Sequence, residues 1–211
     1  MKYPHANANV SDLTERNADE LSRAIHAKQV SCREVMLAYL DRIDRINPTY
    51  NALVSLQEPD ALLRQADQRD AQLARGESMG WMHGMPQAIK DIPPVAGMRT
   101  TGGAQVMRDV VPSEDGLMVQ RMRAAGCVII GRSNTPEFGL GSHTFNEVFG
   151  ITRNSYDRSK SAGGSSGGAG DANAAGRRWF GLHGLVAQPG RLEQCVRPAT
   201  EPWSGADVAN D

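Results

Sequence analysis

The sequence predicts an α/β protein in which helices cover a sheet. Residues 127–130, Cys-Val-Ile-Ile, form a continuous apolar run, which is typical of a strand buried on both faces. Residues 86–91 read as a second strand, and helical patterns of apolar residues lie before and between these two segments. Strands that alternate with helices are typical of a layered α/β architecture.

Two helix starts carry the capping-box pattern, in which a polar N-cap residue is followed three positions later by glutamate. Asn17 and Glu20 begin a short amphipathic helix that is expected to end near Lys28. Ser31 and Glu34 begin a second helix, with apolar residues at helical spacing.

Proline and glycine mark the next boundaries. The second helix is expected to end at Asn47, because Pro48 disfavours helical geometry in the residue before it. A short strand is expected over 51–56, and a third helix should open at Pro59 and close at Gly76. A fourth helix is expected over residues 113–125, with these side chains facing inward: Leu117, Met118, Val119 and Met122.

Two local roles are also expected further along. Asp91 should orient the backbone of the loop that follows it. Thr135 and Pro136 read as the N-cap and first residue of another helix.

Size and composition exclude several classes of protein. The 211 residues are enough for one domain with a sizeable core, and 40% apolar with 22% charged residues is ordinary for a soluble globular chain. A net charge of −1 gives no electrostatic reason to expect nucleic acid or an anionic membrane as a partner. No apolar run is long enough to span a bilayer, and the N-terminus lacks the apolar core of a signal peptide. A cytoplasmic protein is therefore expected.

The potential metal ligands do not form a metal-binding pattern. The three cysteines are odd in number and widely spaced, which favours a reducing compartment over a disulfide framework. Neither they nor the histidines considered have the spacing of a zinc site: Cys32, Cys127, Cys195, His26, His83 and His143. No metal and no cofactor are expected.

The stretch 161–170, Ser-Ala-Gly-Gly-Ser-Ser-Gly-Gly-Ala-Gly, is the most unusual part of the chain. Taken alone, this composition favours a flexible linker. The alternative is a functional loop, since glycine allows close backbone approach and paired glycines can turn N–H groups toward an anion beside the two hydroxyls.

A second stretch favours the functional loop. Residues 84–91 read Gly-Met-Pro-Gln-Ala-Ile-Lys-Asp, and together the two stretches resemble the amidase signature family, whose members use a Ser-Ser-Lys triad. The resemblance covers about residues 10–169 and includes the segments 97–103, 125–138 and 150–154.

The resemblance implies roles for particular residues. Lys90 matches the lysine of the triad and Ser165 the serine that bridges it to the nucleophile, so both are predicted to be catalytic. A lysine that acts as a base near neutral pH must be desolvated, which suits Lys90 on an apolar strand; a solvated lysine at a strand end is the alternative. Loop support and substrate binding are implied for the neighbours Gly163, Gly164, Ser166 and Gly167.

The resemblance also implies a fold and its limits. The expected fold is the N-terminal part of the amidase signature fold, a mixed β-sheet surrounded by helices, in truncated form. Residues 1–170 are predicted to form this partial domain. Residues 171–211 contain no Lys, Ile, Met or Tyr and no apolar period, so they are predicted to be an aberrant, poorly ordered tail.

The family's third motif, the loop with the nucleophilic serine, is missing from the sequence. Codons that encode residues 179–185 can be read one base later as Gly-Ser-Asp-Phe-Met-Gly-Ser, which is that loop, and synonymous codons for 186–197 continue the match. We therefore interpret the tail as a frameshifted reading in which a few codons before the loop are also lost.

The predicted ancestral function is hydrolysis of a carboxamide C–N bond, with this chain inactive because the nucleophile loop is missing. The first alternative is a fragment of the A-type subunit of a tRNA-dependent amidotransferase, which shares these motifs and requires partner subunits. The second is a non-catalytic, inert fragment. The expected partner of the intact family is a small amide substrate, with no direct nucleic acid or membrane partner and a possible homo-oligomer.

Overall fold

The computed structural model describes residues 13–174. The predictions for residues 1–12, and for the tail from residue 175 onward, lie outside the described residues. The last described helix, α6 (Gly167–Ala174), continues past the boundary that was predicted at residue 170.

The two helices predicted from capping boxes are present. Helix α2 spans Ala18–His26 and α3 spans Cys32–Tyr50. The Asn17 side chain accepts a hydrogen bond from the Glu20 N–H at 2.8 Å, and the Glu20 carboxylate accepts one from the Asn17 N–H. The same reciprocal bonds join Ser31 and Glu34, so each helix start satisfies N–H groups that would otherwise lack a partner.

The predicted end of the second helix is wrong. Helix α3 continues through Pro48 to Tyr50 and ends where Asn51 takes a left-handed conformation with φ of 51°. Proline only disfavours helical geometry in the preceding residue; here Asn47 stays helical, and its amide group accepts the N–H groups of Ala52 and Leu53. The predicted strand 51–56 is consequently shortened to β1 (Leu53–Val54).

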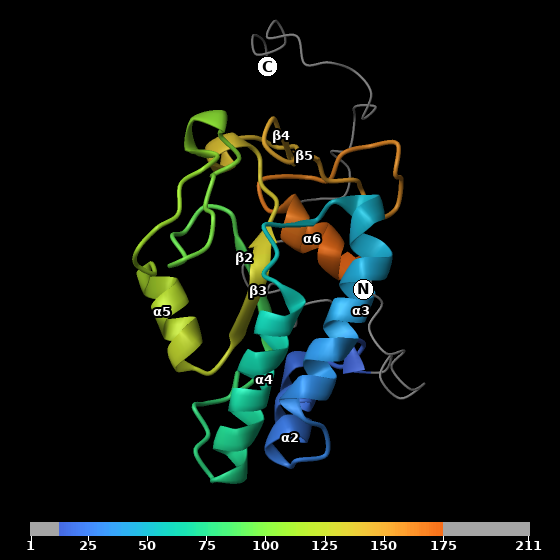
Figure 1. Cartoon of the computed structure of the whole chain (residues 1–211). Helices are drawn as coiled ribbons and strands as arrows, with labels where there is room; N and C mark the ends of the chain where they lie inside the picture. Colours follow the sequence, from blue (N-terminus) through green and yellow to red (C-terminus); the bar gives the residue numbers. More distant parts are fainter. Residues whose placement is uncertain (1–12, 175–211) are drawn as a thin grey trace, which may run out of the picture.

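A mixed three-stranded sheet forms the centre of the described region. Its strands β1, β2 (Pro86–Lys90) and β3 (Val128–Ser133) lie in the order β1-β3-β2. Strand β2 is parallel to β3, whereas β1 is antiparallel to it. Figure 1 shows the strands between α5 (Leu117–Ala124) on one side and α3 on the other.

The remaining elements are helix α4 (Pro59–Ala74), two short 3-10 helices and a small hairpin. Helix α4 packs against α3 and β3. The 3-10 helices span Gln105–Met107 and Glu137–Gly139, and strands β4 (Phe145–Asn146) and β5 (Gly150–Ile151) form the hairpin.

The core lies between the helices and the sheet. Ile89 of β2 and Ile129 and Ile130 of β3 are fully buried, as are Ile25 and Met36 from the first two helices. This confirms the reading of residues 127–130 as a buried strand and shows why the strand pattern is continuous rather than alternating.

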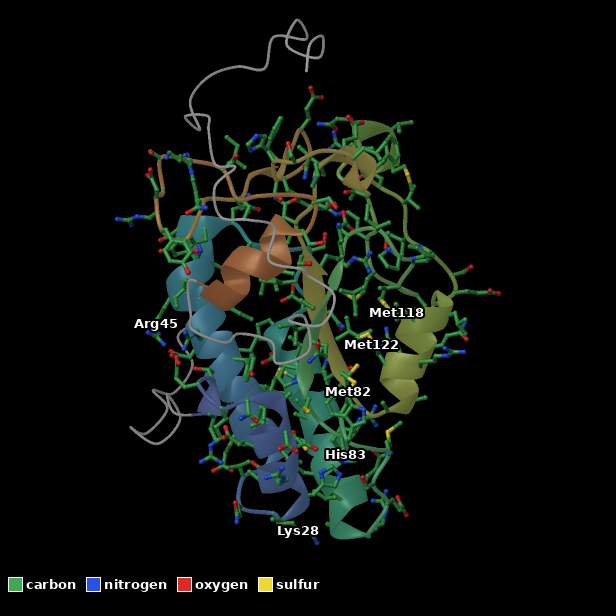
Figure 2. The ribbon with its side chains drawn as sticks, turned by 180° about the vertical axis from the view of Figure 1, so that it is seen from behind. Lys28, Arg45, Met82, His83, Met118 and Met122 are labelled. Atoms are coloured by element: carbon green, nitrogen blue, oxygen red, sulfur yellow. The ribbon has the colours of Figure 1, made fainter. Side chains whose placement is uncertain are left out.

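The inward face predicted for α5 is only partly correct. The helix begins at Leu117 rather than near residue 113, and Val119 is fully buried, but Leu117 is 63% exposed and Met118 42% exposed. Figure 2 shows Met82, Met118 and Met122 grouped near α5. Together with neighbours they line an open groove of about 380 Å³, formed by Trp81, Met82, Leu117, Met118, Arg121, Met122 and Ala125.

A buried ion pair joins the two parallel strands. Arg132 of β3 donates to the carboxylate of Asp91 at 3.1 Å, and both side chains are 0% exposed. The Arg132 guanidinium also donates to the Pro93 carbonyl at 2.6 Å. The Asp91 carboxylate accepts the N–H and hydroxyl of Thr101, so the predicted role of Asp91 in orienting the following loop is confirmed.

None of the helices described for residues 13–174 combines the length and the hydropathy of a membrane-spanning segment.

Replacing Arg132 by methionine should lower the free energy of unfolding by about 3–5 kcal/mol, because the buried Asp91 carboxylate would lose its partner. Urea unfolding followed by circular dichroism measures the change. The control is Arg23→Met, which removes an exposed pair with Asp19 and should have little effect. Equal effects of the two substitutions would contradict the assigned importance of the buried pair.

Candidate active site

Lys90 is positioned by the pairing of β2 with β3. It is the last residue of β2 and lies opposite Ser133, the last residue of β3. Because the strands are parallel, their carboxyl ends meet at one edge of the sheet, which is where α/β folds commonly place their sites. The segment after β3, beginning with Asn134 and Thr135, therefore starts beside Lys90.

The glycine-serine loop reaches the same edge. The Lys90 ammonium donates hydrogen bonds to the Ser165 hydroxyl at 2.8 Å and to the Ser166 hydroxyl at 3.1 Å. The predicted proximity of Lys90 and Ser165 is thus met across 75 residues of sequence. The stretch is a structured turn that leads into α6, with a cis peptide bond between Gly164 and Ser165, and the flexible-linker alternative does not describe it.

Burial changes the acid–base behaviour of Lys90. The side chain is half-buried, and desolvation lowers its pKa from the usual value of 10.5. The adjacent Asp91 carboxylate is already bonded to Arg132 and Thr101. The Lys90 ammonium therefore has two neutral hydroxyls as its hydrogen-bond partners. A carboxylate partner would stabilise the charged form of the lysine, whereas neutral hydroxyls allow it to lose its proton more easily.

Two threonines attach the loop to the segment after β3. Thr135 was predicted to be a helix N-cap, which is wrong: Pro136 is extended, the following 3-10 turn has no side-chain cap, and the Thr135 hydroxyl instead donates to the Ser165 carbonyl at 3.1 Å. The Thr144 hydroxyl accepts the Gly167 N–H at 3.0 Å and donates to the Gly163 carbonyl at 3.2 Å.

A buried amide network supports Thr135. The Asn146 side chain donates to the Asn134 side chain and to the Thr135 carbonyl, both at 2.7 Å. Asn134 donates in turn to the Thr152 hydroxyl at 3.0 Å. Sequence reasoning missed this network and Thr144. The available signal was the run of short polar residues that follows a buried strand, a place where loops carry function.

The loop glycines have different surroundings. A Cβ added to Gly167 would overlap the Thr144 hydroxyl oxygen, and one added to Gly168 would overlap the Asn134 backbone nitrogen. A Cβ at Gly164 would meet the Gly141 carbonyl at 2.6 Å, whereas Gly163 has open space at this position. The close approach of the loop to its support therefore requires glycine at three of these positions.

The histidines form local contacts. His83 accepts the Met79 N–H through Nδ1 and bonds to the Arg69 carbonyl through Nε2, and His26 and His143 bond to serines. Within residues 13–174, no group of three or more metal-ligating side chains could hold a metal ion. Cys32 and Cys127 are free and buried.

A family model described as Amidase matches residues 34–182, well over half of the chain. The chain belongs to the amidase signature family. The match includes both Lys90 and the glycine-serine loop.

The curated relatives are longer proteins. The A-type subunit of glutamyl-tRNA(Gln) amidotransferase from Acidothermus cellulolyticus is 44% identical over 166 residues, which is 79% of this chain and 33% of that protein. The protein of the same name from Carboxydothermus hydrogenoformans is 39% identical over 199 residues, 92% of this chain and 40% of that protein. The chain thus spans about a third of the length of the curated relatives it matches.

Solved structures of amidase signature enzymes share the fold. Fatty acid amide hydrolase matches with a TM-score of 0.76 and 27% identity, over 81% of this chain and 30% of that one. A bacterial aryl acylamidase of the amidase signature family matches with a TM-score of 0.72 and 30% identity, over 78% of this chain and 34% of that one. These likenesses confirm the predicted amidase signature α/β fold, of which the chain covers about a third.

The lowered pKa of Lys90 should make stability depend on pH. The pKa of Lys90 in the folded protein lies below its value in the unfolded chain, which is near 10.5. In the pH window between these two pKa values the unfolded state binds more protons. The free energy of unfolding should therefore rise with pH through this window. Lys90→Met removes the titration. The free energy of unfolding of the unmodified protein minus that of Lys90→Met should therefore increase as pH rises through the window.

Urea titrations at several pH values measure this difference. Lys28→Met is the matched control, because it makes the same substitution at an exposed lysine. A difference between the unmodified protein and Lys90→Met that stays constant across the window would contradict the desolvation of Lys90.

Proposed function

We propose that this chain is the N-terminal part of an amidase that hydrolyses carboxamide C–N bonds, with Lys90 as the base and Ser165 as the bridging serine. The observation that supports this most directly is the 2.8 Å hydrogen bond between the Lys90 amine and the Ser165 hydroxyl, on a lysine whose pKa is lowered by burial. Membership of the amidase signature family supports the same reaction class.

The mechanism follows from the weakness of an amide as an electrophile, which requires an activated hydroxyl. Neutral Lys90 accepts the proton of Ser165 as Ser165 accepts the proton of the nucleophilic serine. The nucleophile's oxygen bonds to the carbonyl carbon, and the C–N bond breaks as the proton returns through Ser165 to the departing amine. Water then repeats the relay to release the acid.

The neighbours of Ser165 have supporting roles in this proposal. Ser166 shares the Lys90 ammonium and helps to hold it at the loop. Gly163 and Gly164 are exposed, which is compatible with contact to a substrate in this proposal, and Gly167 is buried against Thr144. Gly163 also supports the loop, because its carbonyl accepts the Thr144 hydroxyl.

The 211-residue chain itself is proposed to be inactive. In this proposal its tail is read in a shifted frame, so the nucleophilic serine and the oxyanion donors of its loop are absent from the amino-acid sequence. A relay that ends at Ser165 has no nucleophile at its far end, and a developing oxyanion has no dedicated donors.

A second candidate function is that of a fragment of an amidotransferase subunit. The observation that favours it is the 44% identity to the A-type subunit of a glutamyl-tRNA(Gln) amidotransferase. Such a protein would act with partner subunits, so co-purification of the intact protein with an amidotransferase partner would favour this function over a free amidase.

The third candidate function is that of an inert, non-catalytic fragment. Measurements of compactness distinguish this candidate from the others. Protease resistance and a cooperative unfolding transition would indicate a folded fragment, whereas aggregation would indicate an inert product.

We infer a cytoplasmic location for the intact enzyme and a small amide substrate, and a homo-oligomer is compatible with this function.

The shifted-frame proposal predicts the nucleotide sequence of the gene. Codons 179–197, read one base later, should encode the nucleophile loop and its continuation, because synonymous codons can produce both readings. Sequencing of this region from independent DNA preparations checks the prediction. A shifted frame that encodes no Gly-Ser-Asp segment would disprove it.

Restoring the frame and the missing codons should restore amide hydrolysis. In a panel of simple aryl and alkyl amides, the unrepaired chain should show at least about a 10⁴-fold lower rate, since loss of a triad nucleophile has effects of this order or larger. Lys90→Ala in the repaired protein should abolish most of its activity, with Lys28→Ala as the matched control. Turnover by the unrepaired chain that Lys90→Ala removes would contradict the proposal of inactivity.

A further inference from the structure

A single threonine hydroxyl closes the loop that carries Ser165. Thr144 donates to the Gly163 carbonyl and accepts the Gly167 N–H, so it uses both its donor and an acceptor lone pair. These two backbone groups lie on either side of Ser165 and Ser166. The hydroxyl thus joins the entry and the exit of the turn.

The hydroxyl itself is held rigidly. Thr144 is fully buried; its N–H donates to the Ala162 carbonyl and its carbonyl accepts the Thr152 N–H, both at 2.9 Å. Because threonine is β-branched, its side chain has restricted freedom about χ1. The absence of a side chain on Gly167 lets the helix start approach the hydroxyl closely.

We infer that Thr144 is a positioning residue for the proton relay. Its single hydroxyl group bonds to both ends of the loop and thereby holds the Ser165 hydroxyl against the Lys90 amine. The inference rests on the proposed function of Lys90 and Ser165. A turn rich in glycine has a large conformational entropy when it is free, so two hydrogen bonds at its ends remove most of the alternatives in which Ser165 leaves Lys90.

Thr135 provides a separate attachment at the centre of the loop. Its hydroxyl donates to the Ser165 carbonyl, which fixes one backbone oxygen but leaves the two ends of the turn unconnected. Loss of the Thr135 bond should therefore have a smaller effect on Ser165 than loss of the Thr144 pair of bonds.

The charged and titratable groups on the described elements around the loop are few. Asp91 and Arg132 pair with each other, Glu137 is exposed, and His143 bonds to the Ser161 hydroxyl. The polar contacts of the loop with its support are otherwise made by neutral hydroxyl, amide and backbone groups. Water that enters when the loop loosens should hydrate the Lys90 ammonium and shift its pKa back toward the usual value.

The test measures Lys90 directly and does not depend on catalysis. The chain has four lysines, and each can be acylated with trace acetic anhydride over a range of pH and quantified by mass spectrometry. The midpoint for Lys90 should lie below that for exposed Lys28. Thr144→Val keeps the shape of the side chain but removes both hydrogen bonds, and it should move the Lys90 midpoint up toward that of Lys28.

Three further variants make the result specific. Thr144→Ser retains the hydroxyl and should restore the original midpoint. Thr135→Val should give a smaller shift than Thr144→Val. Thr14→Val makes the same chemical change at a buried threonine whose hydroxyl bonds to Arg42, and it should leave the Lys90 midpoint unchanged. Near-ultraviolet circular dichroism reports whether each variant keeps its native packing.

Each outcome decides the inference. An unchanged Lys90 midpoint in folded Thr144→Val, or an equal shift in Thr14→Val, would overturn it. Loss of the native fold in Thr144→Val would overturn it as well, because the hydroxyl would then support the whole domain rather than the loop. Failure of the proposed function appears differently: the repaired protein would lack amide hydrolysis while the Thr144→Val shift of the Lys90 midpoint persisted.

Discussion

The parallel pairing of β2 with β3 is the constraint on which the rest of the site depends. It brings Lys90 level with Ser133, so the chain that leaves β3 begins its polar segment at the same edge as the lysine. The buried Asp91–Arg132 pair joins the two strands at this edge. Because the Asp91 carboxylate also accepts the N–H and hydroxyl of Thr101, the register of the two strands is tied to the geometry of the loop after Asp91.

The serine loop is held against this edge by polar groups rather than by apolar packing. Its attachments are the hydroxyls of Thr135 and Thr144. The buried amide of Asn146 bonds to the Thr135 carbonyl, and backbone bonds to Ala162 and Thr152 hold Thr144. Hydrogen bonds in a buried network have defined directions, so they fix the orientation of a backbone more narrowly than apolar contacts do. This suits a site in which one hydroxyl must stay within bonding distance of one amine.

Local signals in the sequence were sufficient for the starts of α2, α3 and α4, the buried strand and the position of Lys90. The capping boxes at Asn17 and Ser31 act within four residues, and the apolar run of β3 reflects burial on both faces. Two predictions failed for different reasons. Helix α3 passes through Pro48, where the Asn47 amide accepts the N–H groups of residues 52 and 53. Thr135 bonds to the distant Ser165 instead of capping a helix.

The pairing of Lys90 with Ser165 was predictable only through the family resemblance, because no local pattern connects residues so far apart in sequence. The role of Thr144 had no local signal either, since a single threonine in a polar segment is ordinary. The exposed Leu117 and Met118 show the same limit: helical spacing marks an apolar stripe but does not tell how much of it the fold covers.

The unequal surroundings of the loop glycines give a way to tell whether this turn is still under selection. Gly167 and Gly168 leave no room for a methyl group, whereas Gly163 faces open space. In a lineage that must still fold this turn, substitutions should accumulate at Gly163 and be excluded from the other two positions. In a gene that is no longer under selection, all three glycines would be substituted at similar rates. The pattern of substitutions among homologous genes therefore shows whether the turn is still maintained.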